Sequence, residues 1–341
     1  MPERPALEAY LDRVWYGAAS GYALRPLAWV FGAVVGLRRA LYAAGLLRSE
    51  RIACPVVVVG NLSVGGTGKT PLTAYLAARL AAAGRRPGIA TRGHGSASTA
   101  TRLVRADSTA AEVGDEPLLL SRHSGVPVCV GARRAQAARQ LVAAGCDIVL
   151  CDDGLQHLAL ARDLQIVVID GTRGLGNGRL LPAGPLREPA ERLAAADFLV
   201  INGPLTAALA LPAGALTMRL VGDRAVAVAG GGDRALASFR GQRVHAVAGI
   251  GNPERFFASL RAAGLQPIEH RWPDHHAYRP ADLKFGDALP VLMTEKDAVK
   301  CQAFAQPQHW YVPVVASFDA TEEARLLECL LALPRRGDRT L

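Results

Sequence analysis

The segment Gly60-Asn-Leu-Ser-Val-Gly-Gly-Thr-Gly-Lys-Thr-Pro71 has the composition and surroundings of a phosphate-binding loop. The valine-rich stretch 55–60 before it predicts a buried strand, and the Ala- and Leu-rich stretch 70–83 after it predicts a helix. Glycines in such a loop let backbone N–H groups turn inward around phosphates, and the helix N-terminus adds partial positive charge. The segment therefore predicts a P-loop that binds the phosphates of a nucleoside triphosphate.

The residues of this P-loop have predicted tasks. Lys69 is expected to reach the β- and γ-phosphates, and Thr70 to offer its hydroxyl to Mg²⁺. The residues expected to contact the nucleotide are Ser63, Val64, Gly65, Gly66, Thr67, Gly68, Lys69, Thr70 and Pro71. Ser63 departs from the full pattern, which has glycine six residues before the lysine, so Gly65 and Gly66 are expected to supply the flexibility instead.

A second motif, Asp147-Ile-Val-Leu-Cys-Asp-Asp-Gly154, is an apolar strand that ends in two carboxylates. Carboxylates at the end of a strand beside a P-loop can hold Mg²⁺ directly or through water, so Asp152 and Asp153 are predicted metal residues. The alternative is a solvated turn at a strand end. Gln156 and His157 follow at once and can line the same site.

Two further segments admit two interpretations each. Gly114-Asp115-Glu116-Pro117 precedes a helical run, where an aspartate either serves helix capping or acts as a general base toward an acceptor hydroxyl. Asp274-His275-His276 lies in a polar stretch and is either a surface loop or a histidine that supports a carboxylate base. Further ligands at a spacing suitable for zinc are not evident near these histidines.

The rest of the chain predicts an α/β fold, a P-loop NTPase-like, mostly parallel sheet with helices on both faces. Apolar strand-like runs alternate with helical stretches such as 132–144. The predicted strands are 55–60, 88–92, 127–130, 147–151, 164–170, 197–201 and 243–248, with further candidates at 290–293 and 310–315. The 341 residues suggest about two domains. We predict a helical segment at 1–50, a P-loop domain at 51–225 and a smaller C-terminal α/β domain at 226–341.

The formal net charge of +9 suits anionic partners, namely nucleotides, nucleic acid or an anionic membrane surface. The cations are scattered and aromatics make up only 6% of the chain, so no stacking platform for nucleic acid is evident. Six cysteines without a CxxC pair indicate buried thiols in a reducing compartment. The N-terminus has no pattern of a secretory signal.

The apolar stretch 27–37 would span roughly 16 Å as a helix, about half of a bilayer core, and is too short to cross a membrane. Two interpretations stay open: a helix that packs on the core, or one that lies on a membrane surface. In the second, the aromatic anchors would be Trp15, Tyr16, Trp29 and Phe31. The residues facing anionic head groups would be Arg25, Arg38, Arg39, Arg48 and Arg51.

Together and in this order, the motifs resemble the tetraacyldisaccharide 4′-kinases, the lipid A kinase family of Gram-negative bacteria. The resemblance runs from Val59 to about Lys300. Besides the P-loop, it is carried by Thr91-Arg-Gly-His94, Gly114–Pro117, Asp152-Asp-Gly-Leu-Gln-His157, Asn177-Gly-Arg-Leu-Leu-Pro-Ala-Gly-Pro-Leu-Arg-Glu188, Gly249-Ile-Gly-Asn-Pro253, Asp274-His275 and Thr294-Glu-Lys-Asp-Ala-Val-Lys300. His94 departs from the family, where tyrosine is expected.

The resemblance implies a kinase that moves the γ-phosphate of ATP, with Mg²⁺, to the 4′-hydroxyl of a tetraacyldisaccharide 1-phosphate. It also implies that Asp115 is the catalytic base and His275 its partner. The active-site lining would include Arg92, Glu116, Gln156, His157, Arg187 and Glu188. The C-terminal domain would contribute to the active-site cleft. The N-terminal helices would contact the cytoplasmic face of the inner membrane, as a peripheral or monotopic protein.

Two rival functions remain at this point. A membrane-associated P-loop ATPase switch would share the P-loop, Asp152 and the N-terminal segment, but would need no acceptor base. A GTPase usually selects guanine with Asn/Thr-Lys-x-Asp, whereas Thr294-Glu-Lys-Asp297 has suitable residues at the wrong spacing.

Overall fold

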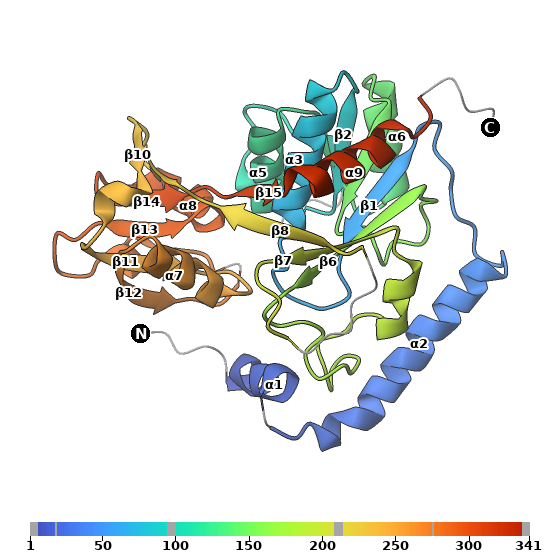
Figure 1. The fold of residues 1–341 in the computed structure, drawn as a ribbon, viewed down its shortest axis with the longest axis horizontal. Helices are drawn as coiled ribbons and strands as arrows, with labels where there is room; N and C mark the ends of the chain where they lie inside the picture. Colours follow the sequence, from blue (N-terminus) through green and yellow to red (C-terminus); the bar gives the residue numbers. More distant parts are fainter. Residues whose placement is uncertain (1–5, 18, 94–99, 208–213, 275, 336–341) are drawn as a thin grey trace. The chain divides into compact units, whose positions relative to one another are not determined.

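The computed structural model describes residues 6–17, 19–93, 100–207, 214–274 and 276–335. The chain forms two compact units, each with a sheet of its own (Figure 1). The larger unit runs from Ala9 to Leu220 and resumes at Ala316, and the smaller unit comprises chiefly Val221–Val315.

The larger unit is built on a nine-stranded sheet. Its strands are β1 (Val56–Gly60), β2 (Pro87–Thr91), β3 (Arg102–Leu103), β4 (Val128–Val130), β5 (Ile148–Asp152), β6 (Leu164–Asp170), β7 (Phe198–Asn202), β8 (Leu216–Val221) and β15 (Val315–Phe318). Their order across the sheet is β15-β8-β7-β6-β1-β5-β2-β4-β3. The pairs from β8 to β4 are parallel, and β3 runs antiparallel to β4. The predicted mostly parallel α/β sheet is confirmed.

Helices cover both faces of this sheet. Those outside the smaller unit are α1 (Ala6–Tyr16), α2 (Arg25–Ala43), α3 (Lys69–Ala82), α4 (Ala110–Val113), α5 (Asp115–Ser124), α6 (Arg134–Ala143) and α9 (Ala320–Leu331). Successive β1 valines face opposite sides: Val56 and Val58 join the core that contains α6, while Val57 and Val59 join the core that contains α3. A strand that is buried on both faces has a continuous apolar sequence, and for this reason β1 could be predicted.

The smaller unit has a six-stranded sheet. Its strands are β9 (Arg224–Ala227), β10 (Asp233–Ala235), β11 (Arg243–Ala248), β12 (Gln266–Arg271), β13 (Val291–Thr294) and β14 (His309–Val312), and its helices are α7 (Pro253–Ala262) and α8 (Glu295–Cys301). The order is β10-β9-β14-β13-β11-β12, and only the pairs that involve β9 are antiparallel. Its core is separate from that of the larger unit, for example around Phe239 and Phe257.

The smaller unit ends earlier than the domain predicted at 226–341, because the chain returns to the larger unit at Ala316. Leu326 and Leu330 of α9 are buried in the core of the larger unit. The single strand expected at 310–315 is also wrong, since β14 and β15 belong to different sheets. Pro313 lies between these two strands, where a residue without a backbone N–H cannot continue a ladder.

The N-terminal segment is helical, as expected. α2 runs along the outside of the larger unit, and Ala28 is its buried residue (Figure 1). In the part of the chain that the structure describes, no helix combines the length and the apolar character needed to cross a membrane.

Candidate active site

The P-loop joins the carboxyl end of β1 to the N-terminus of α3, as the motif predicts. Gly65 and Gly68 adopt φ values of 110° and 94°, which L side chains rarely adopt. Gly68 is also packed against Asn202 at the end of β7, so closely that a Cβ atom would collide with the amide. The Asn202 amide donates to the carbonyl of Thr67 at 2.9 Å. Glycine at position 68 is therefore required both for backbone conformation and for space.

Ser63 begins the loop without needing glycine. Its backbone forms an antiparallel bridge with Leu186, and the adjacent Val64 N–H donates to the carbonyl of Pro185 at 2.9 Å. The Asn61 amide donates to the carbonyl of Ser63 at 2.7 Å. The first turn of the P-loop is thus paired with the segment 185–187, and extended backbone of this kind suits any residue. Of the two glycines expected to supply flexibility, Gly65 has the positive φ.

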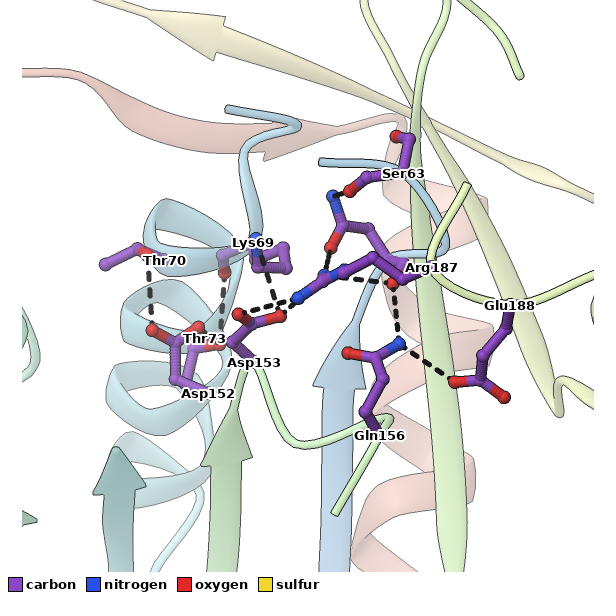
Figure 2. A network of polar contacts seen from close by, with 10 residues as sticks. Ser63, Lys69, Thr70, Thr73, Asp152, Asp153, Gln156, Arg187 and Glu188 are labelled. Atoms are coloured by element: carbon purple, nitrogen blue, oxygen red, sulfur yellow. Dashed lines mark hydrogen bonds and ion pairs between the residues drawn. The ribbon is translucent and has the colours of Figure 1, made fainter. Parts of the chain in front are cut away.

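Asp152, the last residue of β5, lies beneath the start of α3 (Figure 2). Its carboxylate accepts hydrogen bonds from the hydroxyls of Thr70 at 3.2 Å and Thr73 at 3.1 Å. Burial, and then the nearby Glu116, raise the pKa of Asp152 to about 6, although Lys69 opposes them. The predicted partners Thr70 and Asp152 therefore lie side by side, and both present oxygen atoms.

Asp153 has a different environment from its neighbour (Figure 2). Arg187 donates to both of its carboxylate oxygens, at 3.1 and 2.9 Å, and Nζ of Lys69 lies 3.6 Å from Oδ1. Burial acts to raise the pKa of Asp153, but Lys69 and Arg187 outweigh it and hold the pKa well below its usual range. Asp153 also adopts a φ of 49°, an uncommon value for a residue with a side chain. Such local strain is often found at functional sites.

Gln156 and Glu188 connect the motif after β5 with the loop that carries Arg187. The Gln156 amide donates to Glu188 Oε1 at 2.9 Å and to the carbonyl of Asn61 at 3.2 Å. Arg187 also donates to that carbonyl, at 3.1 Å. Glu188 is only 3% exposed and pairs with Arg192 at 3.4 Å. Gln156 and Arg187 thus share the Asn61 carbonyl, and Gln156 and Glu188 link the segment after β5 to the loop that carries the arginine.

Asp115 and Glu116 are the first two residues of α5, which packs against α3. Asp115 is buried. Gly114 occupies the N-cap position, so Asp115 is not the N-cap residue. The charge of Glu116 helps to raise the pKa of Asp152, so this helix start lies near the carboxylate that ends β5.

His157 and Arg92 lie near one further cation that the sequence analysis missed. Burial, and then Arg134, lower the pKa of His157 to about 4, and Arg92 adds to the effect. Arg134 begins α6, is 3% exposed, and donates to the carbonyl of Gly131 at 2.7 Å. Its charge interacts with Asp152 and Asp153. The sequence signal for Arg134 was a pair of arginines, Arg133-Arg134, in the segment that follows a buried strand, where ligands of parallel sheets bind. His275 and His94 lie outside the described residues.

A P-loop at the end of one strand and paired carboxylates at the end of its neighbour define a P-loop protein that handles nucleotide phosphates. Residues 21–332 match the family model described as tetraacyldisaccharide-1-P 4′-kinase. The chain therefore belongs to the tetraacyldisaccharide-1-P 4′-kinase family, and it is a kinase.

Individual relatives agree with this assignment. The chain is 52% identical over 320 residues to the tetraacyldisaccharide 4′-kinase of Xanthomonas euvesicatoria, covering 92% of this chain and 93% of that one. It is 53% identical over 313 residues to the enzyme of the same name from Alkalilimnicola ehrlichii, with the same coverage. A crystal structure of LpxK from Aquifex aeolicus in complex with ATP has a TM-score of 0.75 and 28% identity, covering 91% of this chain and 98% of that chain. The kinase interpretation thus prevails over the switch and the GTPase.

Proposed function

We propose that this kinase transfers the γ-phosphoryl group of ATP to the 4′-hydroxyl of a tetraacyldisaccharide 1-phosphate in lipid A biosynthesis. The names of the relatives, and the ATP bound by the Aquifex aeolicus protein, support both substrates. The observation that carries the proposal is that Arg187 contacts both Asp153, directly after β5, and the Asn61 carbonyl at the start of the P-loop. Phosphoryl transfer is catalysed mainly by positioning and by charge neutralisation, and this arrangement supplies both.

Lys69 and the N–H groups of the loop from Ser63 to Pro71 would bind the phosphates. Lys69 lies 3.6 Å from Asp153, so its ammonium is held at the mouth of the loop before the nucleotide arrives. The positive φ values of Gly65 and Gly68 support a loop that turns its N–H groups toward an anion. Arg187 keeps Asp153 from competing fully for Lys69.

Thr70 and Asp152 would hold Mg²⁺, with Asp153 in the surrounding shell. The hydroxyl and the carboxylate are 3.2 Å apart, and oxygen ligands of this kind suit Mg²⁺, which usually completes its shell with phosphate oxygens and water. A bound Mg²⁺ would neutralise charge on the phosphates and lower the pKa of Asp152 toward its ordinary value. We therefore expect Asp152 to be ionised when the site is occupied.

Asp115 would accept the proton of the 4′-hydroxyl. Burial at the start of α5, next to α3, gives this carboxylate a fixed position near the P-loop helix. A sugar hydroxyl is a weak acid, so a positioned carboxylate assists its deprotonation. The roles of His275 as partner, of Arg92, Glu116 and His157 as lining, and of the C-terminal domain in the cleft rest on the family resemblance.

The N-terminal helices would place the enzyme on the cytoplasmic face of the inner membrane. Leu27, Val30, Val34 and Leu37 are 58–63% exposed and share one face of α2. An exposed apolar stripe followed by Arg38 and Arg39 suits insertion among anionic head groups. A diacylated sugar stays in the bilayer, so its kinase must work at that surface.

The role of Asp115 is tested with Asp115→Asn, which keeps the shape of the side chain and removes the base. We expect transfer to the lipid to fall on the order of 10²–10⁴-fold while the Kd for ATP stays near the parent value. Asp107→Asn removes an exposed carboxylate from the same region and should behave like the parent. Transfer by Asp115→Asn at the parental rate would show that another group takes the proton.

A further inference from the structure

Arg173 lies on the opposite side of the P-loop from the carboxylates of β5. β1 pairs with β5 on one side and with β6 on the other, so the loops after both strands border the P-loop. Asp170 ends β6, and Arg173 follows three residues later. Because parallel strands end at the same edge of the sheet, this segment reaches the edge where phosphates bind.

The guanidinium of Arg173 lies against the P-loop itself. A Cβ atom on Gly65 would be 3.8 Å from Nη1 of Arg173. Gly65 has a φ of 110° and belongs to the central part of the loop, whose backbone N–H groups surround the outer phosphates. A cation beside Gly65 is therefore close to the terminal phosphate of a bound nucleotide.

Arg173 is held at this position from two sides. Its backbone N–H donates to Oδ1 of Asp170 at 3.3 Å, and the carbonyl of Asp170 accepts from Gly174 at 2.7 Å. Its guanidinium carbon lies 4.9 Å from the ring centre of Tyr16, the last residue of α1. Stacking on an aromatic face fixes a guanidinium in one orientation. A pre-organised cation of this kind is what stabilisation of developing charge requires.

The other cations of the site, Lys69, Arg134 and Arg187, have their contacts on the β5 side of the P-loop. Arg187 donates to Asp153, and Lys69 pairs with the same carboxylate. Arg134 is bonded to Gly131 after β4. These three serve the β5 side of the P-loop, whereas Arg173 comes from the β6 side. The phosphates would thus be flanked by carboxylates and metal on one side and by a guanidinium on the other.

We propose that Arg173 is a catalytic residue that donates hydrogen bonds to the γ-phosphoryl group during transfer, and that Tyr16 holds it there. The inference rests on the phosphoryl transfer proposed above. In that step the γ-phosphorus forms a bond to the acceptor 4′-oxygen, its bond to the β–γ bridging oxygen breaks, the hydroxyl proton passes to Asp115, and ADP leaves. Charge develops on the oxygens of the transferred group and of the leaving ADP, and a guanidinium stabilises it.

Arg173→Ala should lower kcat by on the order of 10³-fold with a Kd for ATP near the parent value. Arg173→Lys should recover only a minor part of this loss, because an ammonium lacks the planar fork. Tyr16→Phe, which keeps the ring, should stay closer to the parent than Tyr16→Ala. Arg79→Ala is the matched control, since Arg79 lies ten residues along α3 from Lys69, roughly 15 Å away by helix rise.

Trapping of ADP with aluminium fluoride, which mimics the transferred phosphoryl group, distinguishes a catalytic role of Arg173 from a merely structural one. The parent and Arg79→Ala should hold ADP far more tightly with the fluoride than without it. Arg173→Ala should bind ADP alone normally and lose this gain. The proposal would be overturned if Arg173→Ala lost its binding of ADP alone, or if aluminium fluoride tightened its ADP binding as much as in the parent. An unchanged kcat of Arg173→Ala would overturn it as well. If the parent phosphorylates no lipid, the proposed function fails, while the trap still reports on Arg173.

Discussion

At the scale of the residue, Arg187 acts together with Lys69 on the charge of Asp153. It donates to both oxygens of Asp153 and to the Asn61 carbonyl that begins the P-loop. Arg187→Ala leaves Asp153 with Lys69 as its partner, so the lysine is drawn away from the phosphates. We expect the KM for ATP to rise on the order of 10–100-fold, as for loss of one member of a partly buried pair.

Arg187→Lys is the informative comparison for this prediction. It keeps the charge but cannot make the bidentate contact with Asp153, so its KM should lie between those of the parent and Arg187→Ala. Steady-state kinetics with varied ATP measures the order of the three proteins. A KM for ATP within twofold of the parent in Arg187→Ala would refute this account of Asp153 and Lys69.

Asp152 links the site to the pH dependence of stability. Its pKa is about 6 in the folded protein, above the ordinary value of 3.8 that applies to an unfolded chain. The folded state therefore binds this proton more tightly, and its stability decreases as pH rises from 3.8 through about 6. Above pH 6 the penalty is complete, at most about 3 kcal/mol for a shift of this size.

Asp152→Asn should remove that penalty while it abolishes transfer. Urea unfolding of the nucleotide-free variant should show a gain in stability over the parent at pH 8 that shrinks at pH 5. The expected gain comes from removal of a buried charge. A stability difference between Asp152→Asn and the parent that does not change with pH would show that burial does not raise the pKa of Asp152. Stabilisation with loss of activity is a common sign that a buried carboxylate serves function.

At the scale of the element, α2 presents its apolar stripe outside the folded core. Val34→Glu together with Leu37→Glu places two charges in this stripe, at side chains that are 60% and 62% exposed. We expect sedimentation with vesicles that contain anionic lipid to fall at least tenfold, and transfer to lipid to fall with it. ATP binding should be unchanged, because the P-loop lies on other elements.

Leu331→Glu is the control for this prediction, since Leu331 is an exposed leucine that belongs to another helix, α9. Its variant should bind vesicles like the parent. Equal vesicle binding by the α2 double variant and the parent would show that another surface docks on the membrane.

The elements show what the sequence could and could not predict. β1, α3 and the end of β5 were predictable because an all-apolar strand, a glycine loop and an acidic strand end occur together, and their combination is typical of a P-loop site. Arg187 was expected at the site through resemblance, but its bidentate contact with Asp153 depends on how 185–187 pairs with Ser63 and Val64. Arg134 had only the signal of two arginines after a buried strand, which does not separate it from Arg133. Arg173 could not be identified, because nothing local distinguishes an arginine near phosphates from an arginine on a surface.

At the scale of the whole molecule, the two units were expected but the path of the chain was not. An amphipathic helix such as α9 can pack on either core, and its sequence does not say which. In the structure it covers the larger sheet, so the smaller unit is inserted between β8 and β15 and connected by two chain segments. A truncation at residue 225 would therefore remove α9 from the larger core, and independent folding of 51–225 is not expected.

In the proposed reaction, the γ-phosphate goes to a lipid hydroxyl. The most direct test is a single-turnover reaction of γ-labelled ATP with excess enzyme and tetraacyldisaccharide 1-phosphate in detergent micelles. We predict that the label appears in a lipid that now carries two phosphates, the new one at the 4′ position. Release of the label as inorganic phosphate, with the lipid unchanged, would contradict it.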